Sequence, residues 1–395
     1  MHDLAIAGVG SIPVRRDLCS PLLDACVQVA REAITDAGLQ LGDVDGLFVT
    51  PARMSGEPWL MFVANLAEYL GVRTKGLQCV ENGGATALLT LRAAMDAVAL
   101  GRCERALVIA SDTRPMLDTQ HFESFVRQVV FTATALYGPV YAIAGLGTPI
   151  PFYAMSHQRY MHEYGVTERE IAMCSVVLRE HAVHHPDAQF RDPITVDDVL
   201  SSKRLSPPIR LLQAASISAG ACAVVVTRAN QVGTDARPRV ELTGYGEHHL
   251  PSHFVPRHGS ITRFESVVEA GQQALAQAGR TVSEVDVAEV YAPFCATELI
   301  LYEDLGFCEK GQGAQFLADG RSTFGGDVVI NPTGGRMSFG HPSGATPLYE
   351  VVEVVRQLRG DALGKQVDGA RVGLVHAEHG MMNGSVVCVM EARGG

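Results

Sequence analysis

Residues 265–293 read ESVVEAGQQALAQAGRTVSEVDVAEVYAP, and residues 21–51 follow the same plan as PLLDACVQVAREAITDAGLQLGDVDGLFVTP. Each stretch is an amphipathic helix, an Ala-Gly stop, an acidic turn and an apolar strand. A constant shift superposes Ala37-Gly38 on Ala278-Gly279 and aligns the two strands that follow. The chain is therefore predicted to consist of two halves that share one plan.

A second correspondence follows later in each half. Gly84-Ala85-Thr86 and Gly344-Ala345-Thr346 each precede a long apolar-periodic stretch, and an apolar strand comes next. The alternation predicts an α/β protein, with mainly parallel sheets flanked by helices. If the halves are related by a pseudo-twofold axis, two helix N-termini meet there, and their converging amides can stabilise an oxyanion or a thiolate. The expected helices cover 87–100 and 347–358, and the expected strands cover 106–110 and 372–375.

The domain boundaries follow from this duplication. Residues 1–235 form the N-terminal half, and residues 236–395 form the C-terminal half. An insertion at about 112–215 interrupts the first half, with a helix near 152–185 and a loop at 186–198. Insertions of this kind often shape substrate specificity.

Residues 129–156 carry no formal charge and are long enough to span a bilayer. Glycine and proline interrupt the segment repeatedly, and a lipid-exposed helix could not satisfy so many broken backbone hydrogen bonds. We therefore expect a buried or interface segment, suited to a bulky apolar substrate or a partner, and no membrane span.

Charge and cysteine content exclude other classes. The 395 residues carry a formal net charge of −11, whereas nucleic-acid binding needs a basic face. The nine cysteines are odd in number and include no C-x-x-C pair, which favours a reducing cytoplasmic location over a disulfide framework. His181, His184 and His185 lack a Cys or carboxylate at ligand spacing, so we interpret them as part of a surface loop and expect no metal.

The motifs of the C-terminal half resemble the thiolase superfamily, and within it the sterol-carrier-protein thiolase branch. The matching stretches run in order from Glu298-Leu299 through Tyr302 to Cys308, then Gly311-Gln312-Gly313, Asn331 to Gly335, Gly340 to Thr346 and Gln357 to Gly360. The resemblance implies a five-layered αβαβα fold of two similar halves and a homodimer. It also implies a coenzyme A thioester as substrate with no bound cofactor, and chemistry at the bond between its α and β carbons.

The resemblance also assigns site residues. His341 matches the histidine that activates the nucleophile, and Ser343, Gly344 and Gly380 would contact coenzyme A. Glu81 stands where ordinary thiolases have the nucleophilic cysteine, as a base, a proton relay or a helix cap. Cys79, two residues earlier, is either a relocated thiol with a lowered pKa at the helix dipole or a structural cysteine.

Three further residues depart from the ordinary thiolase pattern. Tyr291 replaces the asparagine or histidine that orders the oxyanion water; it could donate to an oxyanion, take a hydroxyl proton, or be a core aromatic. Thiolase-like steroid side-chain aldolases are similar in lacking the cysteine and carrying this tyrosine, but they depart from the G-H-P motif kept here. Glu378 or His379 could replace the second cysteine as acid or base, or both could lie solvated beside a turn.

Three functions remain open on the sequence. The first is acyl transfer or thiolysis, with His341 activating a thiol such as Cys79. The second is retro-aldol cleavage of a β-hydroxyacyl-CoA without an acyl-enzyme. The third is a non-catalytic scaffold. The resemblance also implies a possible small partner protein that combines an OB-fold with a zinc ribbon.

Overall fold

The computed structural model describes residues 3–51, 60–112, 149–233, 237–251 and 259–394, together with isolated positions between 123 and 135. Most of the uncharged segment 129–156 therefore lies outside the described residues, and its last part begins a helix at Pro149. Within the described part of the chain, no helix has the length and apolar character needed to cross a membrane.

In the described part of the N-terminal half, five strands lie in the spatial order β1-β7-β4-β2-β3. Strand β2 pairs in parallel with β3 and β4, whereas β7 pairs antiparallel with β4 and β1. The strands are β1 (Leu4–Ser11), β2 (Gly46–Val49), β3 (Gly76–Cys79), β4 (Arg105–Asp112) and β7 (Gly220–Arg228).

The C-terminal half repeats this arrangement as β8-β12-β11-β9-β10. The parallel and antiparallel pairs fall at the same places, so the predicted duplication is confirmed. Each half is a mixed sheet, and the expectation of mainly parallel sheets is wrong. The strands are β8 (Arg239–His249), β9 (Val287–Val290), β10 (Val329–Ile330), β11 (Val372–His379) and β12 (Gly384–Arg393).

A short antiparallel contact between β1 and β8 joins the halves into one ten-stranded sheet, with Ile6 opposite Val240. This contact lies between equivalent strands, as expected near a pseudo-twofold axis. Strands β11 and β12 are antiparallel because a tight turn joins them. In the first half, the insertion occupies the same connection between β4 and β7.

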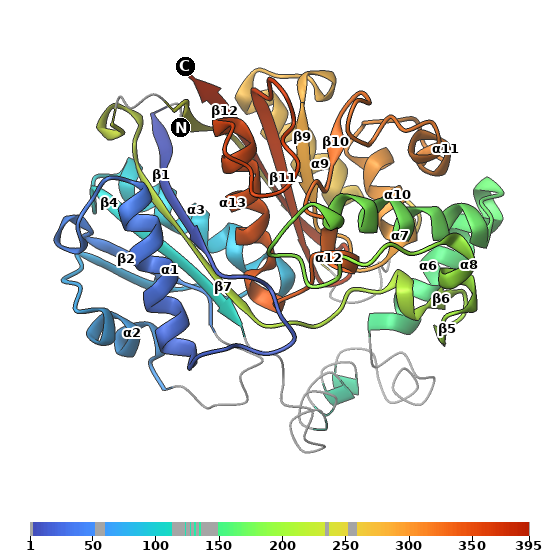
Figure 1. The fold of residues 1–395 in the computed structure, drawn as a ribbon, viewed down its shortest axis with the longest axis horizontal. Helices are drawn as coiled ribbons and strands as arrows, with labels where there is room; N and C mark the ends of the chain where they lie inside the picture. The colour runs from blue at the N-terminus through green and yellow to red at the C-terminus, as the bar shows by residue number, and fades with distance from the viewer. Residues whose placement is uncertain are drawn as a thin grey trace.

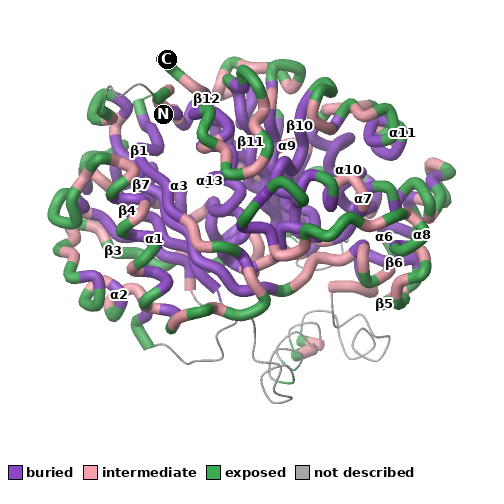
Figure 2. The backbone as a smooth tube through the Cα atoms, in the orientation of Figure 1, coloured by how far each residue is buried: buried purple, intermediate pink, exposed green. Residues whose placement is uncertain are grey.

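Helices complete a five-layered αβαβα arrangement (Figure 1). One buried cluster lies between the two halves of the sheet and includes α3 (Thr86–Ala99) and α13 (Thr346–Arg359). A second covers the outer face of the first half, with α1 (Leu22–Asp36) and α2 (Phe62–Leu70). A third covers the second half, with α9 (Glu265–Ala278) and α10 (Cys295–Asp304). The strands and the helix faces turned toward them are mostly buried (Figure 2).

The insertion differs from its prediction. The single helix expected near 152–185 is two helices, because Gly165 adopts a positive φ of 71° and Thr167 caps a new helix. The loop expected at 186–198 ends at Val196, where another helix begins. The elements are α6 (Pro149–Tyr164), α7 (Glu168–Val183), α8 (Val196–Ser201) and the hairpin of β5 (Arg204–Ser206) with β6 (Ile209–Arg210).

Short helical turns bring the two halves together at the centre. The 3-10 turns η2 (Gly83–Ala85) and η6 (Ser343–Ala345) open α3 and α13, and they contact each other. Two small helices complete the C-terminal half, α11 (Gly313–Ala318) and α12 (Gly335–Ser338). The expected meeting of two helix N-termini is confirmed.

Candidate active site

Tyr291 lies directly after β9 and reaches the start of α3. A methyl group added to Gly84 would lie 2.6 Å from the Tyr291 hydroxyl oxygen and 2.5 Å from the carbonyl oxygen of Glu378. Only glycine therefore lets the phenol approach the helix start this closely. The hydroxyl has no hydrogen-bond partner among the residues that the structure describes, so it is available to a ligand at the N-terminus of α3.

The end of β9 is held in place by Asn331. Its side-chain carbonyl accepts from the amide of Val290 at 2.8 Å, and its amide donates to the carbonyl of Val290 at 3.3 Å. The Tyr291 amide donates to the carbonyl of His376 at 3.2 Å. Asn331 has a φ of 53°, a conformation that asparagine tolerates better than most residues. These hydrogen bonds fix the direction of β9 up to Tyr291 and therefore the direction of its phenol.

His341 stands on the other side of the phenol. The two rings are 5.7 Å apart in an edge-to-face arrangement, and Nδ1 of His341 lies 2.8 Å from the Thr346 hydroxyl. Burial of the ring, with a smaller effect of the Arg336 charge, holds the pKa of His341 well below its usual range. The ring is therefore neutral near pH 7 and is suited to donating a hydrogen bond to an oxyanion.

Ser218, just before β7, holds the backbone of His341. Its hydroxyl accepts from the amide of His341 at 3.1 Å, and its own amide donates to the carbonyl of His341 at 2.9 Å. A second backbone hydrogen bond joins the His341 amide to the carbonyl of Ser216. The segment before β7 thus clamps the backbone of His341.

Arg336 was missed by the sequence analysis. Its guanidinium lies over the ring of Tyr291, the residue is 2% exposed, and Nε and Nη2 have no partner among the described residues. Burial lowers the pKa of Arg336 well below its usual value, although Glu350 and Glu378 favour the charged form. The sequence could have indicated Arg336 by its position, because it directly follows Asn331 to Gly335, a motif already matched to the family.

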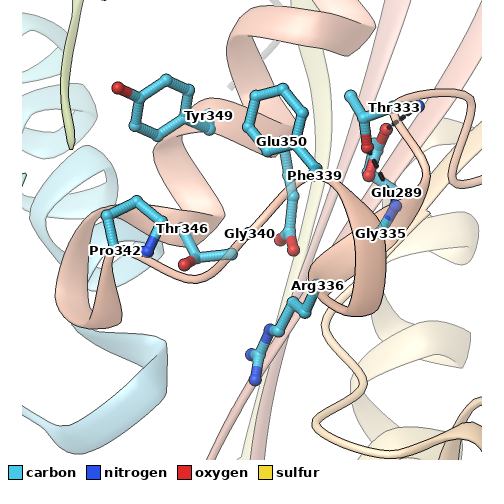
Figure 3. Close-up of a pocket in the computed structure, with 10 residues that line it drawn as sticks. All are labelled: Glu289, Thr333, Gly335, Arg336, Phe339, Gly340, Pro342, Thr346, Tyr349 and Glu350. Atoms are coloured by element: carbon cyan, nitrogen blue, oxygen red, sulfur yellow. Dashed lines mark hydrogen bonds between the residues drawn. The ribbon is translucent and has the colours of Figure 1, made fainter. Parts of the chain in front are cut away.

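A small cavity lies behind the loop that carries His341, with room for about one water molecule. Figure 3 shows Glu350 reaching into it from α13, and Arg336 at its lower edge. One carboxylate oxygen of Glu350 is buried without a partner. The cavity is lined by Glu289, Thr333, Gly335, Arg336, Phe339, Gly340, Pro342, Thr346, Tyr349 and Glu350.

Glu378 and His379 take different faces at the end of β11. Glu378 is buried and accepts from the Met382 amide at 2.9 Å and from the Tyr153 hydroxyl at 3.2 Å, and burial raises its pKa. The alternative that Glu378 is solvated is therefore wrong. His379 is partly exposed, and its Cβ would lie 3.1 Å from a Cβ added to Gly83, so it borders the start of α3.

Cys79 and Glu81 lie at the edge of the molecule. Cys79 ends the outermost strand β3, and both residues are exposed. Partial shielding from water, and then the nearby charge of Glu81, raise the pKa of Cys79. Both expectations for Cys79 therefore differ from the structure. Its pKa is raised and not lowered by a helix dipole, and the residue is exposed and not buried. Residues 82–86 at the helix start contain no thiol.

The residues assigned to coenzyme A occupy two loops. The Gly344 amide donates to Asp112 at 3.3 Å within η6, next to Ser343, which has a φ of 21°. Gly380 has a φ of 59° in the turn after β11, where its carbonyl accepts from the Asn383 side chain. Their contact with coenzyme A stays a prediction.

The expectation of a surface loop is wrong for two of the three histidines of the insertion, whereas His184 is exposed at the end of α7. His181 and His185 are buried; Nδ1 of His181 bonds the carbonyl of Asn331 at 3.0 Å, and Nε2 of His185 lies 3.2 Å from Glu353. The pattern missed this because the helix packs against the C-terminal half. Within the described ranges, no group of three or more His, Cys, Asp or Glu side chains is arranged to hold a metal ion.

Glu350 and Glu353, one turn apart on α13, predict opposite effects of pH on stability. Burial raises the pKa of Glu350 from 4.5 to about 8, so its contribution to stability is lost as pH rises between these values. Burial alone would raise the pKa of Glu353, but the hydrogen bond and charge of His185 lower it, so its contribution is lost as pH falls.

We therefore expect Glu350→Gln to raise the Tm relative to the unsubstituted protein, increasingly from pH 5 to pH 8. Glu353→Gln, the matched control, should lower the Tm at pH 7 and lower it less near pH 4. Thermal denaturation across this pH range checks both. If the Tm of Glu350→Gln varies with pH in parallel with that of the unsubstituted protein, the raised pKa of Glu350 is contradicted.

Comparisons with known proteins place the fold in a known family. The family model described as Thiolase C-terminal domain-like matches residues 247–392. An acetyl-CoA acetyltransferase of Methanothermobacter thermautotrophicus is 33% identical over 381 residues, covering 95% of this chain and 96% of the relative. A steroid side-chain-cleaving aldolase of Thermomonospora curvata is 32% identical over 365 residues, covering 89% and 90%. The solved structure titled Ltp2-ChsH2(DUF35) aldolase has a TM-score of 0.84 and 28% identity, covering 99% of this chain and 98% of that one.

The fold, with two α/β halves whose helix N-termini meet at the centre, thus defines an enzyme of the thiolase class. Since a relative more than 30% identical matches nearly its whole length, the chain belongs to the thiolase family. Within the family it lies in the sterol-carrier-protein-thiolase-like branch.

Proposed function

We propose that the protein cleaves the Cα–Cβ bond of a β-hydroxyacyl-CoA by a retro-aldol reaction, without an acyl-enzyme. The observation that carries this proposal is the Tyr291 hydroxyl at the start of α3, which has no hydrogen-bond partner among the described residues. Residues 82–86 at this helix start contain no thiol. The similarity to two aldolases supports it.

In this reaction the β-hydroxyl loses its proton and becomes the carbonyl of a released aldehyde or ketone. The electrons of the Cα–Cβ bond pass to the thioester, which becomes an enolate, and its α-carbon then takes the proton. The phenol of Tyr291 and the neutral ring of His341 would donate to the enolate oxygen, and such donors are often the largest contribution to catalysis. No oxidant, reductant or co-reactant is required.

Acyl transfer is the second candidate, because an acetyltransferase is similar over nearly the whole chain and Cys79 lies two residues before Glu81. Against it, the Cys79 thiol is exposed on the edge strand and its pKa is raised, which lowers the thiolate fraction. The two reactions differ in whether an acyl group is ever bound to the protein.

Cys79→Ser separates the two. We expect this variant to cleave a panel of β-hydroxyacyl-CoA thioesters of increasing bulk within about twofold of the unsubstituted rate, since the thiol takes no part. Chromatography would show the shortened acyl-CoA and the carbonyl product, and intact-protein mass spectrometry would show no acyl adduct. An acyl group on Cys79, or cleavage that requires free coenzyme A and is lost in Cys79→Ser, would replace the aldolase with a thiolase.

We further propose that the active form is a homodimer with a small OB-fold and zinc-ribbon partner. Among the described residues, β3 has a neighbouring strand on one side only, and Leu77 on it is 41% exposed. Unpaired edges of this kind readily pair with another chain. The name of the similar aldolase structure joins two components, which supports a second protein as partner. The insertion exposes the apolar side chains Leu205, Leu211 and Ile217, which such a partner could cover. The cleavage assay therefore includes the partner.

A further inference from the structure

A chain of hydrogen bonds leads from the molecular surface to the start of α3. Nε2 of His379 lies 2.6 Å from Nδ1 of His249, and the two rings stack 4.8 Å apart. Nε2 of His249 lies 2.6 Å from one carboxylate oxygen of Glu247. The Tyr245 hydroxyl donates to the other oxygen at 2.7 Å. Three of these four side chains lie on β8, and only His379 on β11 borders Gly83.

The direction of each hydrogen bond follows from the last acceptor. An ionised carboxylate only accepts, so Nε2 of His249 carries a proton. With this single proton on its ring, His249 offers Nδ1 as an acceptor, so Nε2 of His379 carries a proton and Nδ1 of His379 is its unprotonated nitrogen. The chain thus selects one tautomer of His379.

The surroundings keep Glu247 ionised. Burial alone would raise its pKa, but the hydrogen bonds from His249 and Tyr245, together with the nearby charge of Arg92, lower it. The Arg92 guanidinium lies 4.6 Å from the centre of the Tyr245 ring. The charged anchor of the chain is therefore supported from α3 as well as from β8.

Gly384 makes room for the rings of His379 and His249. A side chain added to Gly384, the first residue of β12, would occupy the space of the His379 ring and would reach to 2.6 Å from Nδ1 of His249. A glycine here removes that obstacle. Glu247 and His249 are about one-third exposed, so the outer end of the chain can exchange protons with water.

We propose that Glu247 and His249 are positioning residues that hold His379 with its proton on Nε2, so that Nδ1 accepts the proton of the substrate's β-hydroxyl. This assignment rests on the retro-aldol function proposed above and supplies its missing base. The accepted proton is the one that the α-carbon of the enolate needs, so His379 ends the cycle unchanged. While Nδ1 of His379 holds the substrate's proton, the proton on Nε2 of His379 can shift to His249. The proton on Nε2 of His249 can then shift to Glu247.

The test reads the tautomer directly, by long-range proton–nitrogen NMR of the protein labelled with ¹⁵N-histidine. The His379 signals are identified by their loss in His379→Asn. We expect a protonated Nε2 and an unprotonated Nδ1, a pattern lost in His249→Phe. His249→Gln should restore it, because its side-chain carbonyl accepts from Nε2. A proton on Nδ1, or a pattern unchanged in His249→Phe, would overturn the proposal.

Kinetics provide the second readout. We expect His249→Phe and Glu247→Gln to lower kcat about 10- to 100-fold with KM nearly unchanged, as for other residues that orient a reacting group. His249→Gln should recover most of the rate. The matched control is Glu241→Gln, on the same strand but paired with Arg239. A normal kcat in His249→Phe would show that the chain of hydrogen bonds from Glu247 to His379 takes no part in catalysis. If the unsubstituted protein cleaves no β-hydroxyacyl-CoA, the proposed function fails first, and the role of His379 as base fails with it.

Discussion

Tyr291→Phe is expected to lower kcat for retro-aldol cleavage about 100- to 1000-fold, the usual effect of removing one oxyanion donor. The hydroxyl reaches the start of α3, where the enolate oxygen would lie, and it has no partner within the described residues. Because no internal hydrogen bond is lost, the Tm should stay the same. Steady-state kinetics and thermal denaturation of the purified variant check both expectations.

Tyr302→Phe is the matched control. Its hydroxyl is also buried, but it donates to Glu298 at 2.8 Å, on the far side of β9 from the helix start. This variant should lose about 1 kcal/mol of stability and keep its rate. If Tyr291→Phe cleaves the substrate at the normal rate, or behaves like Tyr302→Phe, the phenol is a packing residue and not part of the site.

Arg336→Met is expected to lower kcat about 100-fold while leaving the Tm unchanged or raising it. A buried cation with two unpaired nitrogens costs several kcal/mol, and replacing such a group with an apolar side chain is often neutral or stabilising. The same charge beside Tyr291 and His341 would stabilise the developing enolate. Opposite changes in rate and stability are the signature of a residue kept for function.

Arg179→Met is the control for this variant. Arg179 is also buried, but it donates to the Ser338 hydroxyl at 3.0 Å and to the carbonyl of Asp192 at 2.9 Å. Its loss leaves acceptors unpaired and should lower the Tm. An Arg336→Met variant that loses as much stability as Arg179→Met, with a normal rate, would make Arg336 a structural residue.

The duplicated plan was predictable because it is local. The helix ends at Ala37-Gly38 and Ala278-Gly279, and the helix starts at Thr86 and Thr346, each depend on a few adjacent residues. The structure has these helices at Leu22–Asp36, Glu265–Ala278, Thr86–Ala99 and Thr346–Arg359. The break at Gly165 was missed because an apolar-periodic pattern continues across it, whereas the cap at Thr167 starts the new helix.

Short spacings along the chain were enough to predict the two-half α/β plan, the family, and the motif residues His341 and Tyr291. Which side chains meet in space depends instead on how distant segments pack. Arg336, on α12 after β10, reaches Tyr291 because β10 lies beside β9. His379 reaches His249 because β11 and β8 pair with opposite sides of β12 at Gly384. The same packing places Cys79 at an outer edge, because β3 is the last strand of its half. Strand order and side-chain direction depend on packing between distant segments, and no local pattern records that packing.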